Sequence, residues 1–108
     1  MPDTQHQKLL NELRASSAHL LGGKGCVLLF GSRARGDNRE DSDWDLLVLL
    51  DRDGDSSWQD YNEIGYPLNE LFWKNNQDVN TIIQTRSEWQ RKSFTPFYKN
   101  VMKDAITL

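Results

Sequence analysis

Residues Leu28–Asp51 read LLFGSRARGDNREDSDWDLLVLLD, and this stretch decides the fold of the chain. An apolar run ends at Gly31-Ser32, a charged loop follows, and a second apolar run begins beside Asp43 and Asp45. Short runs that are apolar at successive positions are typical of strands buried on both faces of a sheet. The stretch therefore predicts two central strands joined by a polar turn.

Helical spacing, strand-like runs and turn residues outline the other elements. The expected elements are a helix ending near Leu21, strands at Cys26–Phe30 and Trp44–Leu50 separated by one helical turn at Ser32–Arg35, a helix from Ser57 to about Lys74, a strand at Asp78–Thr85, two further helices and a last strand at Ile106–Leu108. Gly65 and Pro67 should kink or break the long helix. Ser87 followed by Gln90 has the pattern of a capping box, so a helix should begin there. We expect one α+β domain over residues 1–108, with a small mixed β-sheet covered by helices.

Bulk composition excludes several classes of protein. The net charge of −3 gives no general attraction to nucleic acid or to an anionic membrane. No apolar run approaches the length of a membrane span, and the N-terminus is too polar for a signal peptide. The single cysteine, Cys26, excludes an internal disulfide and a cysteine-rich zinc site. A cytoplasmic protein is therefore the expectation.

Asp43 and Asp45 lie one residue apart at the start of a strand, so both side chains should project from the same face. Two neighbouring carboxylates repel each other, and both stay ionised only if a cation or strong donors offset them. The usual cation is Mg²⁺, which takes one or two carboxylates and completes its shell with water and substrate phosphates. Taken alone, such a pair is more often a solvated turn, so its interpretation depends on its neighbours.

The Gly31-Ser32 pair changes that interpretation. Glycine directly after an apolar strand lets the backbone approach a ligand closely and point N–H groups at an anion. Ser32 adds a hydroxyl donor, and Arg33 and Arg35 add positive charge. A phosphate cradle one strand away from a two-carboxylate metal site is the arrangement that nucleotidyl transfer requires.

The two motifs together resemble a known signature. They are Gly31-Ser32-Arg33-Ala34-Arg35-Gly36 and Ser42-Asp43-Trp44-Asp45-Leu46. They look like the motifs of the nucleotidyltransferase superfamily related to DNA polymerase beta, and more narrowly of the minimal nucleotidyltransferase (MNT) group. The resemblance implies the nucleotidyltransferase fold, and it implies transfer of a nucleoside monophosphate from a nucleoside triphosphate to an acceptor hydroxyl.

The resemblance also implies a role for each position of the motifs. Gly31 and Ser32 would hold the nucleotide phosphates, and Asp43 and Asp45 would bind Mg²⁺ or Mn²⁺. The two arginines have alternative roles: each either reaches the triphosphate or pairs with the acidic loop. The residues in question are Arg33 and Arg35, with Asp37, Glu40 and Asp41 in the loop.

The chain departs from the superfamily pattern on its third strand. Active members carry a third carboxylate there, and the natural alignment places Asn80 at that position. Asparagine offers a carbonyl oxygen to a metal but no charge and no basicity. Asp78 is the alternative source of a carboxylate, because in an extended strand it shares a face with Asn80. Whether Asp78 completes the metal site or is a solvated residue stays open at this point.

Two functions are consistent with these motifs. The first is a Mg²⁺- or Mn²⁺-dependent enzyme that uses a nucleoside triphosphate, with ATP expected, and modifies a protein partner or a small molecule. The second is an MNT-like nucleotide-binding module with impaired chemistry, acting as an antitoxin-type partner of a HEPN-like protein. Asn80 favours the second function, whereas the intact Gly31, Ser32, Asp43 and Asp45 favour the first. A homodimer is a further expectation.

Overall fold

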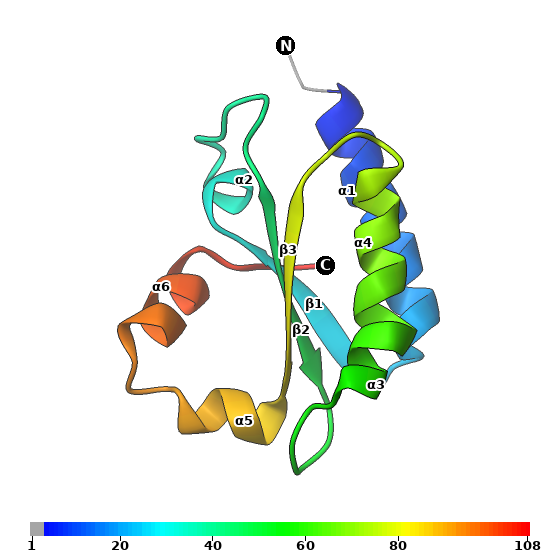
Figure 1. The fold of residues 1–108 in the computed structure, drawn as a ribbon. Helices are drawn as coiled ribbons and strands as arrows, with labels where there is room; N and C mark the ends of the chain where they lie inside the picture. Colours follow the sequence, from blue (N-terminus) through cyan, green and yellow to red (C-terminus); the bar gives the residue numbers. More distant parts are fainter. Residues whose placement is uncertain (1–3) are drawn as a thin grey trace.

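The computed structural model describes residues 4–108, and its centre is a four-stranded sheet in the order β3-β2-β1-β4. The strands are β1 (Gly25–Phe30), β2 (Trp44–Leu50), β3 (Val79–Thr85) and β4 (Ile106–Thr107). Strand β1 pairs antiparallel with β2 and with β4, whereas β2 and β3 are parallel. The expected α+β fold with a small mixed sheet is therefore confirmed (Figure 1).

Helices cover both faces of the sheet. They are α1 (Thr4–Leu21), α2 (Ser32–Arg35), α3 (Trp58–Asp60), the π-helical segment η1 (Tyr61–Gly65), α4 (Tyr66–Trp73), α5 (Arg86–Arg91) and α6 (Pro96–Asp104). Helices α1 and α4 lie on one side, and α5 and α6 lie on the other (Figure 1). Within residues 4–108 we find no helix that is both long enough and apolar enough to span a membrane.

Strand β2 is buried on both faces, as its apolar run predicts. Trp44 and Leu46 pack into the cluster shared with α1 and α4, while Leu47 and Leu49 pack into the cluster shared with α5 and α6. Because neighbouring side chains alternate between faces, Asp45 lies on the α5–α6 side. Trp44 has no exposed surface and packs on the opposite face. The core of β2 thereby fixes which way the carboxylate points.

The long helix is not broken at Gly65 and Pro67: it stays helical from Trp58 to Trp73 and changes only its hydrogen-bond pattern. Residues of η1 form a π-helical turn between α3 and α4, and Pro67 lies in the first turn of α4. A Cβ atom on Gly65 would crowd the ring of Tyr61 and the side chain of Ile83. The glycine therefore permits the close approach of this helix to β3.

The predicted start of α5 is wrong by two residues. Thr85, not Ser87, caps this helix: its Oγ1 accepts a hydrogen bond from the Glu88 backbone N–H at 3.1 Å. The Glu88 carboxylate in turn accepts from the Thr85 backbone N–H at 2.8 Å. Because β3 runs to Thr85, the helix begins directly where the strand ends, and Ser87 instead donates to the Gly54 carbonyl.

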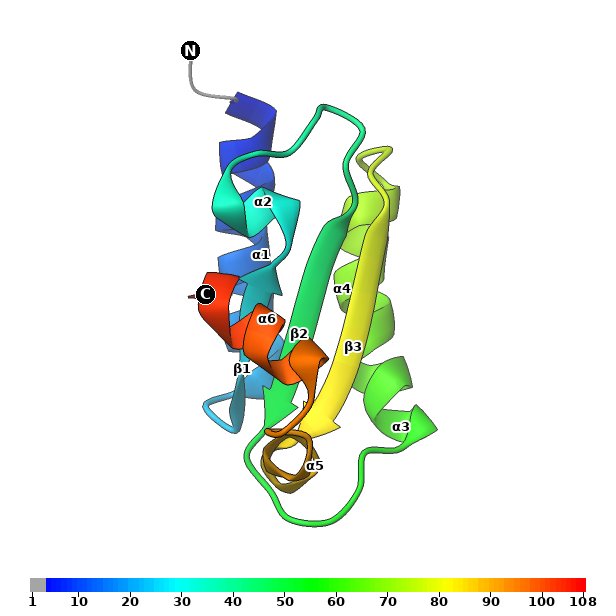
Figure 2. The same ribbon diagram turned by 90° about the vertical axis from the view of Figure 1, so that its left-hand side faces the viewer.

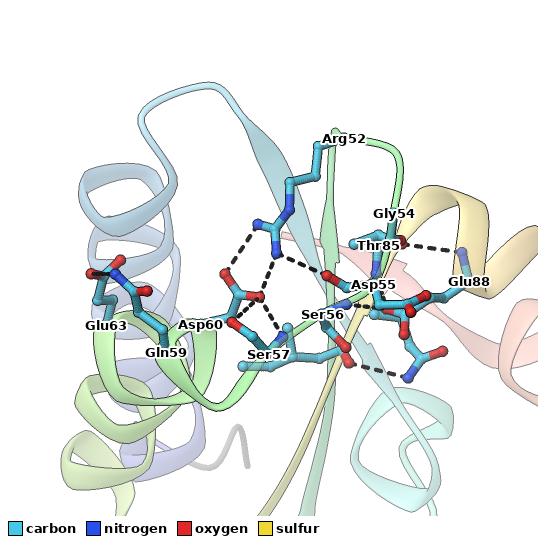
Figure 3. A network of polar contacts seen from close by, with 12 residues as sticks. Arg52, Gly54, Asp55, Ser56, Ser57, Gln59, Asp60, Glu63, Thr85 and Glu88 are labelled. Carbon is cyan, nitrogen blue, oxygen red and sulfur yellow. Dashed lines mark hydrogen bonds and ion pairs between the residues drawn. The ribbon is translucent and has the colours of Figure 1, made fainter.

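A polar network closes the end of the sheet where β2 and β3 finish (Figure 3). Arg52 donates to both carboxylate oxygens of Asp60, which also accepts from the Ser57 backbone N–H at 2.8 Å. Glu88 accepts from the Ser56 backbone N–H at 3.0 Å. The loop after β2 is thus held to the starts of both α3 and α5.

Candidate active site

The candidate residues meet at the opposite end of the sheet, where β1 ends and β2 and β3 begin. Phe30 is the register partner of Asp45, and Asp45 is the register partner of Asn80. Gly31 follows Phe30 directly and leads into α2, which lies at this end of the molecule (Figure 2). Three segments that are far apart in sequence therefore contribute to one site.

Gly31 lies directly against the Asp45 carboxylate. Its φ is 74°, a left-handed value that favours glycine, and a Cβ atom there would overlap with Asp45 Oδ2. Any other residue would both strain the turn and displace the carboxylate. The requirement for glycine at this position therefore comes from the site itself.

Helix α2 is a single turn that starts at Ser32. The Gly31 carbonyl accepts from the backbone N–H groups of Ala34 and Arg35, at 3.1 and 3.0 Å. Gly36 then ends the turn in a left-handed conformation with φ 83°. Ser32 is half-buried and follows Gly31, whose backbone lies against the Asp45 carboxylate, so the turn lies beside Asp45.

Asn80 is the residue that β3 places beside the two aspartates. Its Nδ2 donates to Asp43 Oδ2 at 3.2 Å and to Asp45 Oδ1 at 3.3 Å. An amide therefore stands at the position where the resemblance implies a third carboxylate. The parallel register of β2 and β3 creates this placement, because it sets Asn80 opposite Asp45.

Asp78 is not gathered with the pair. Its backbone carbonyl accepts from the Trp44 N–H at 2.9 Å, one residue before β3 begins, and its side chain is exposed. In the part of the chain that the structure describes, no group of three or more His, Cys, Asp or Glu side chains could hold a metal ion. The structure therefore does not supply the third acidic ligand that Asp78 could have provided.

Burial shapes the electrostatics of the carboxylate pair. It raises the pKa of Asp45, the hydrogen bond from Asn80 lowers it, and the charge of Asp43 raises it again. Arg35 lowers the pKa of Asp45 from nearby. The pKa of Asp45 ends above its ordinary value, because burial outweighs the donors.

Arg33 lies on the wrong face to contact a nucleotide held by Asp45. It is 5% exposed, and its Nη2 donates to the backbone carbonyls of Glu40 and Ser42, each at 3.0 Å. Its guanidinium carbon lies 4.8 Å from the centre of the Trp44 ring, opposite the carboxylates. Arg33 therefore holds the charged loop in place through backbone carbonyls.

Arg35 lies near the site and is held by two carboxylates. Its Nε contacts Asp37 Oδ2 at 3.1 Å, and its Nη1 contacts Asp104 Oδ2 at 3.0 Å. The pairing with the acidic loop was one of the two predicted roles. Asp104, the last residue of α6, was not predicted, because no local pattern relates it to a residue 69 positions away.

The donor set fits a hard divalent cation. Asp43 and Asp45 offer carboxylate oxygens from one face of β2, and Asn80 carries a carbonyl oxygen on the adjacent strand. Mg²⁺ and Mn²⁺ prefer oxygen ligands, and Mg²⁺ commonly binds one or two carboxylates together with water and phosphates. The two carboxylates are therefore the oxygen ligands in place, and the Asn80 amide, which turns its N–H₂ group toward them, could add its oxygen only after rotating.

Comparisons with known proteins identify the family of this chain. The family model described as Polymerase beta, Nucleotidyltransferase matches residues 25–103, well over half of the chain. Protein MJ0604 of Methanocaldococcus jannaschii, assigned as a protein adenylyltransferase, is 29% identical over 82 residues. That alignment covers 76% of this chain and 75% of the relative.

Solved structures share the fold. One described as a minimal nucleotidyltransferase has a TM-score of 0.65 and 28% identity, covering 95% of each chain. A Sulfolobus solfataricus structure described as a nucleotidyltransferase has a TM-score of 0.62 and 23% identity, over 96% of this chain and 79% of that one. A toxin–antitoxin structure with AMP-PNP has a TM-score of 0.55 and 20% identity, over 93% and 69%. The last two similarities concern the fold alone.

Proposed function

Because the chain belongs to the polymerase beta nucleotidyltransferase family, we propose that it transfers a nucleoside monophosphate from a nucleoside triphosphate to an acceptor hydroxyl. The observation that carries this proposal is the contact between Gly31 and Asp45. This contact brings the turn at Gly31-Ser32, which is suited to phosphate, into one site with the carboxylates of Asp43 and Asp45, which are suited to a cation. A merely structural turn would not need its glycine to make room for a carboxylate.

Each residue then has a part in the reaction. Gly31 and Ser32 hold the triphosphate, Asp43 and Asp45 hold the divalent ion, and Arg35 contributes positive charge near the phosphates. A divalent ion held by Asp43 and Asp45 would supply charge neutralisation for the triphosphate and activation of the acceptor oxygen. The acceptor oxygen bonds to the α-phosphorus, and the bond between the α-phosphorus and the oxygen that bridges to the β-phosphorus breaks. Pyrophosphate leaves, and the proton of the hydroxyl passes to solvent.

We further propose ATP as the donor and a protein hydroxyl as the acceptor. The support is the Methanocaldococcus jannaschii relative, whose assigned activity is protein adenylyl transfer. A protein acceptor also suits a site that opens at the end of the sheet, where Asp43 and Asn80 are both exposed. A small-molecule hydroxyl is the other acceptor consistent with the reaction.

A second candidate function is favoured by Asn80. With an amide in place of a carboxylate, the site binds its cation less strongly and lacks one base, so chemistry would be slow. The chain would then act as a nucleotide-binding, antitoxin-type partner of a HEPN-like protein. In that case its effect on the partner would come from binding and not from transfer.

One experiment separates the two functions. The protein, alone and with a co-purifying partner, is incubated with α-labelled ATP, CTP, GTP or UTP and with Mg²⁺ or Mn²⁺. Label transfer that disappears in Asp45→Asn but persists in Asp53→Asn, an exposed aspartate at the other end of β2, supports the enzyme. Nucleotide binding without label transfer or pyrophosphate release, in the presence of the partner, supports the binding module.

A further inference from the structure

Asn80 controls what the carboxylate pair contacts when no cation is present. Its Nδ2 lies 3.2 Å from Asp43 Oδ2 and 3.3 Å from Asp45 Oδ1, so one amide group bridges both carboxylates. Ionised carboxylates only accept hydrogen bonds, so the amide must turn its nitrogen toward them. Its carbonyl oxygen would be repelled from the same position.

The same amide has the opposite chemistry for a cation. A metal ion between Asp43 and Asp45 is bound by oxygen and repelled by the N–H₂ group. The two hydrogen bonds must therefore break, and the amide must rotate by about 180° before its Oδ1 can face the ion. A third aspartate would need no such change, since a carboxylate presents oxygen in every orientation.

We propose that the Asn80 amide has two positions and makes metal binding depend on bound nucleotide. Without nucleotide, its N–H₂ group bridges Asp43 and Asp45 and competes with the cation. With a triphosphate present, its Oδ1 faces the cation. This inference rests on the proposed function, because it requires that a triphosphate binds beside the carboxylate pair.

Ligand number explains the dependence on nucleotide. A cation entering alone binds the two carboxylates, but it displaces two hydrogen bonds to these charged acceptors and gains only one neutral oxygen from the amide. A triphosphate supplies further charged oxygens to the same ion, which tips the balance toward binding. By linkage, the factor by which nucleotide strengthens metal binding equals the factor by which metal strengthens nucleotide binding.

The first test measures Mn²⁺ binding without nucleotide, by electron paramagnetic resonance, for the whole protein and for Asn80→Asp. We expect the variant to bind Mn²⁺ at least about tenfold more tightly, because charge among the ligands raises affinity. Asn62→Asp, on the exposed side of η1, makes the same charge change elsewhere and should leave Mn²⁺ affinity unchanged. Equal affinity of Asn80→Asp and the unchanged protein would overturn the inference.

The second test needs no substitution at the site and follows the Asn80 side-chain N–H₂ signals by ¹⁵N NMR. Adding Mg²⁺ with an ATP analogue carrying a methylene between the α- and β-phosphates should shift these signals, because both hydrogen bonds are lost. Mg²⁺ alone at the same concentration should leave them in place. An equal shift with Mg²⁺ alone would overturn the two-position amide.

The two proposals can fail separately. If no nucleotide binds in the presence of either metal, the proposed function fails, while Mn²⁺ binding to Asn80→Asp still decides whether the amide competes with the cation. If nucleotide binds and label is transferred but Asn80→Asp leaves Mn²⁺ affinity unchanged, the enzyme stands and the role of the amide is wrong.

Discussion

The two ends of the β2–β3 pair both carry carboxylates, and the chain surrounds them differently. At the far end, hydrogen bonds from Arg52 and then from the Ser57 backbone hold the pKa of Asp60 below its ordinary value despite burial (Figure 3). For Glu88, burial acts to raise the pKa, but the donors of Thr85 and Ser56 leave it lowered.

The site end has the reverse balance. Asp43 and Asp45 share the Asn80 amide, and burial leaves the pKa of Asp45 raised. The comparison shows that this chain can supply a carboxylate with donors where the fold needs one. At the site it leaves negative charge undercompensated, which is the condition that favours a cation.

The largest expected effect comes from Asp45→Asn. Label transfer should fall at least about a hundredfold, because the cation loses a charged ligand. The unfolding free energy of the nucleotide-free protein should not fall, since the change removes a partly buried charge and keeps an acceptor for Asn80. Urea unfolding and the transfer assay measure the two quantities. A clear loss of stability would show that this carboxylate also supports the fold.

Asp60→Asn should give the opposite result. Arg52 is partly exposed, so its ion pair contributes less than about 1 kcal/mol, and the bonds to Ser57 add to it. We expect the unfolding free energy to fall by about 1–2 kcal/mol while the transfer rate stays unchanged. Asp53→Asn, in the same loop, is the control and should change neither quantity. If Asp60→Asn lost transfer without losing stability, Asp60 would serve the reaction and not the fold. The proposed difference between the two ends of the β2–β3 pair would then be wrong.

A smaller effect distinguishes the observed cap of α5 from the predicted one. Thr85→Ala should lower the unfolding free energy by about 1 kcal/mol, because Thr85 caps the helix and its hydroxyl donates to the Gly54 carbonyl at 2.6 Å. Ser87→Ala should lower the unfolding free energy less, by about 0.5 kcal/mol, because it removes only the hydrogen bond to the Gly54 carbonyl and no helix cap. Urea unfolding of both variants would decide, and a larger loss at Ser87 would contradict the assignment.

The smallest effect is a dependence on pH that has opposite signs at the two ends. The pKa of Asp60 is lowered from 3.8, so its stabilisation is present above that pH and disappears as the pH falls through the lower folded value. The pKa of Asp45 is raised from 3.8, so its ionisation destabilises the fold as the pH rises above that value. The unfolding free energy should be measured from pH 3 to pH 7. The difference in unfolding free energy between the unchanged protein and Asp60→Asn should become smaller at acid pH. Any advantage of Asp45→Asn should grow toward neutral pH.

Much of the site could be predicted because its information is local. The bounds of β2 and the single turn of α2 match the expectation, and a π-helical segment ends at Gly65, where the sequence predicts a kink or a break. The alignment of Asn80 with the carboxylate pair also follows from strand alternation once the register is known. The spacing of apolar residues and the residue types of turns are properties of neighbouring positions, so they can be read from the sequence.

The rest depends on tertiary placement. Within one helical turn, Arg33 points to the Trp44 face and Arg35 points to the site side, and only packing decides which is which. Asp104 reaches Arg35 from the end of α6, which no spacing rule connects. The cap at Thr85 was missed because the residue also ends a strand, and strand character hid its role in the helix.

The parallel register of β2 and β3 determines how the protein can misfold. Ile82 packs with α5 and α6, whereas Val79 and Ile83 pack with α1 and α4, so the core fixes the side to which Asn80 points. A slip of one residue would turn Asn80 toward the core shared with α1 and α4, and Ile83 toward the face covered by α5 and α6. The chain therefore cannot misplace its amide while keeping its core. Molecules in which the register of β3 has slipped should therefore become insoluble or be degraded. A well-folded population with Asn80 displaced from the site is not expected.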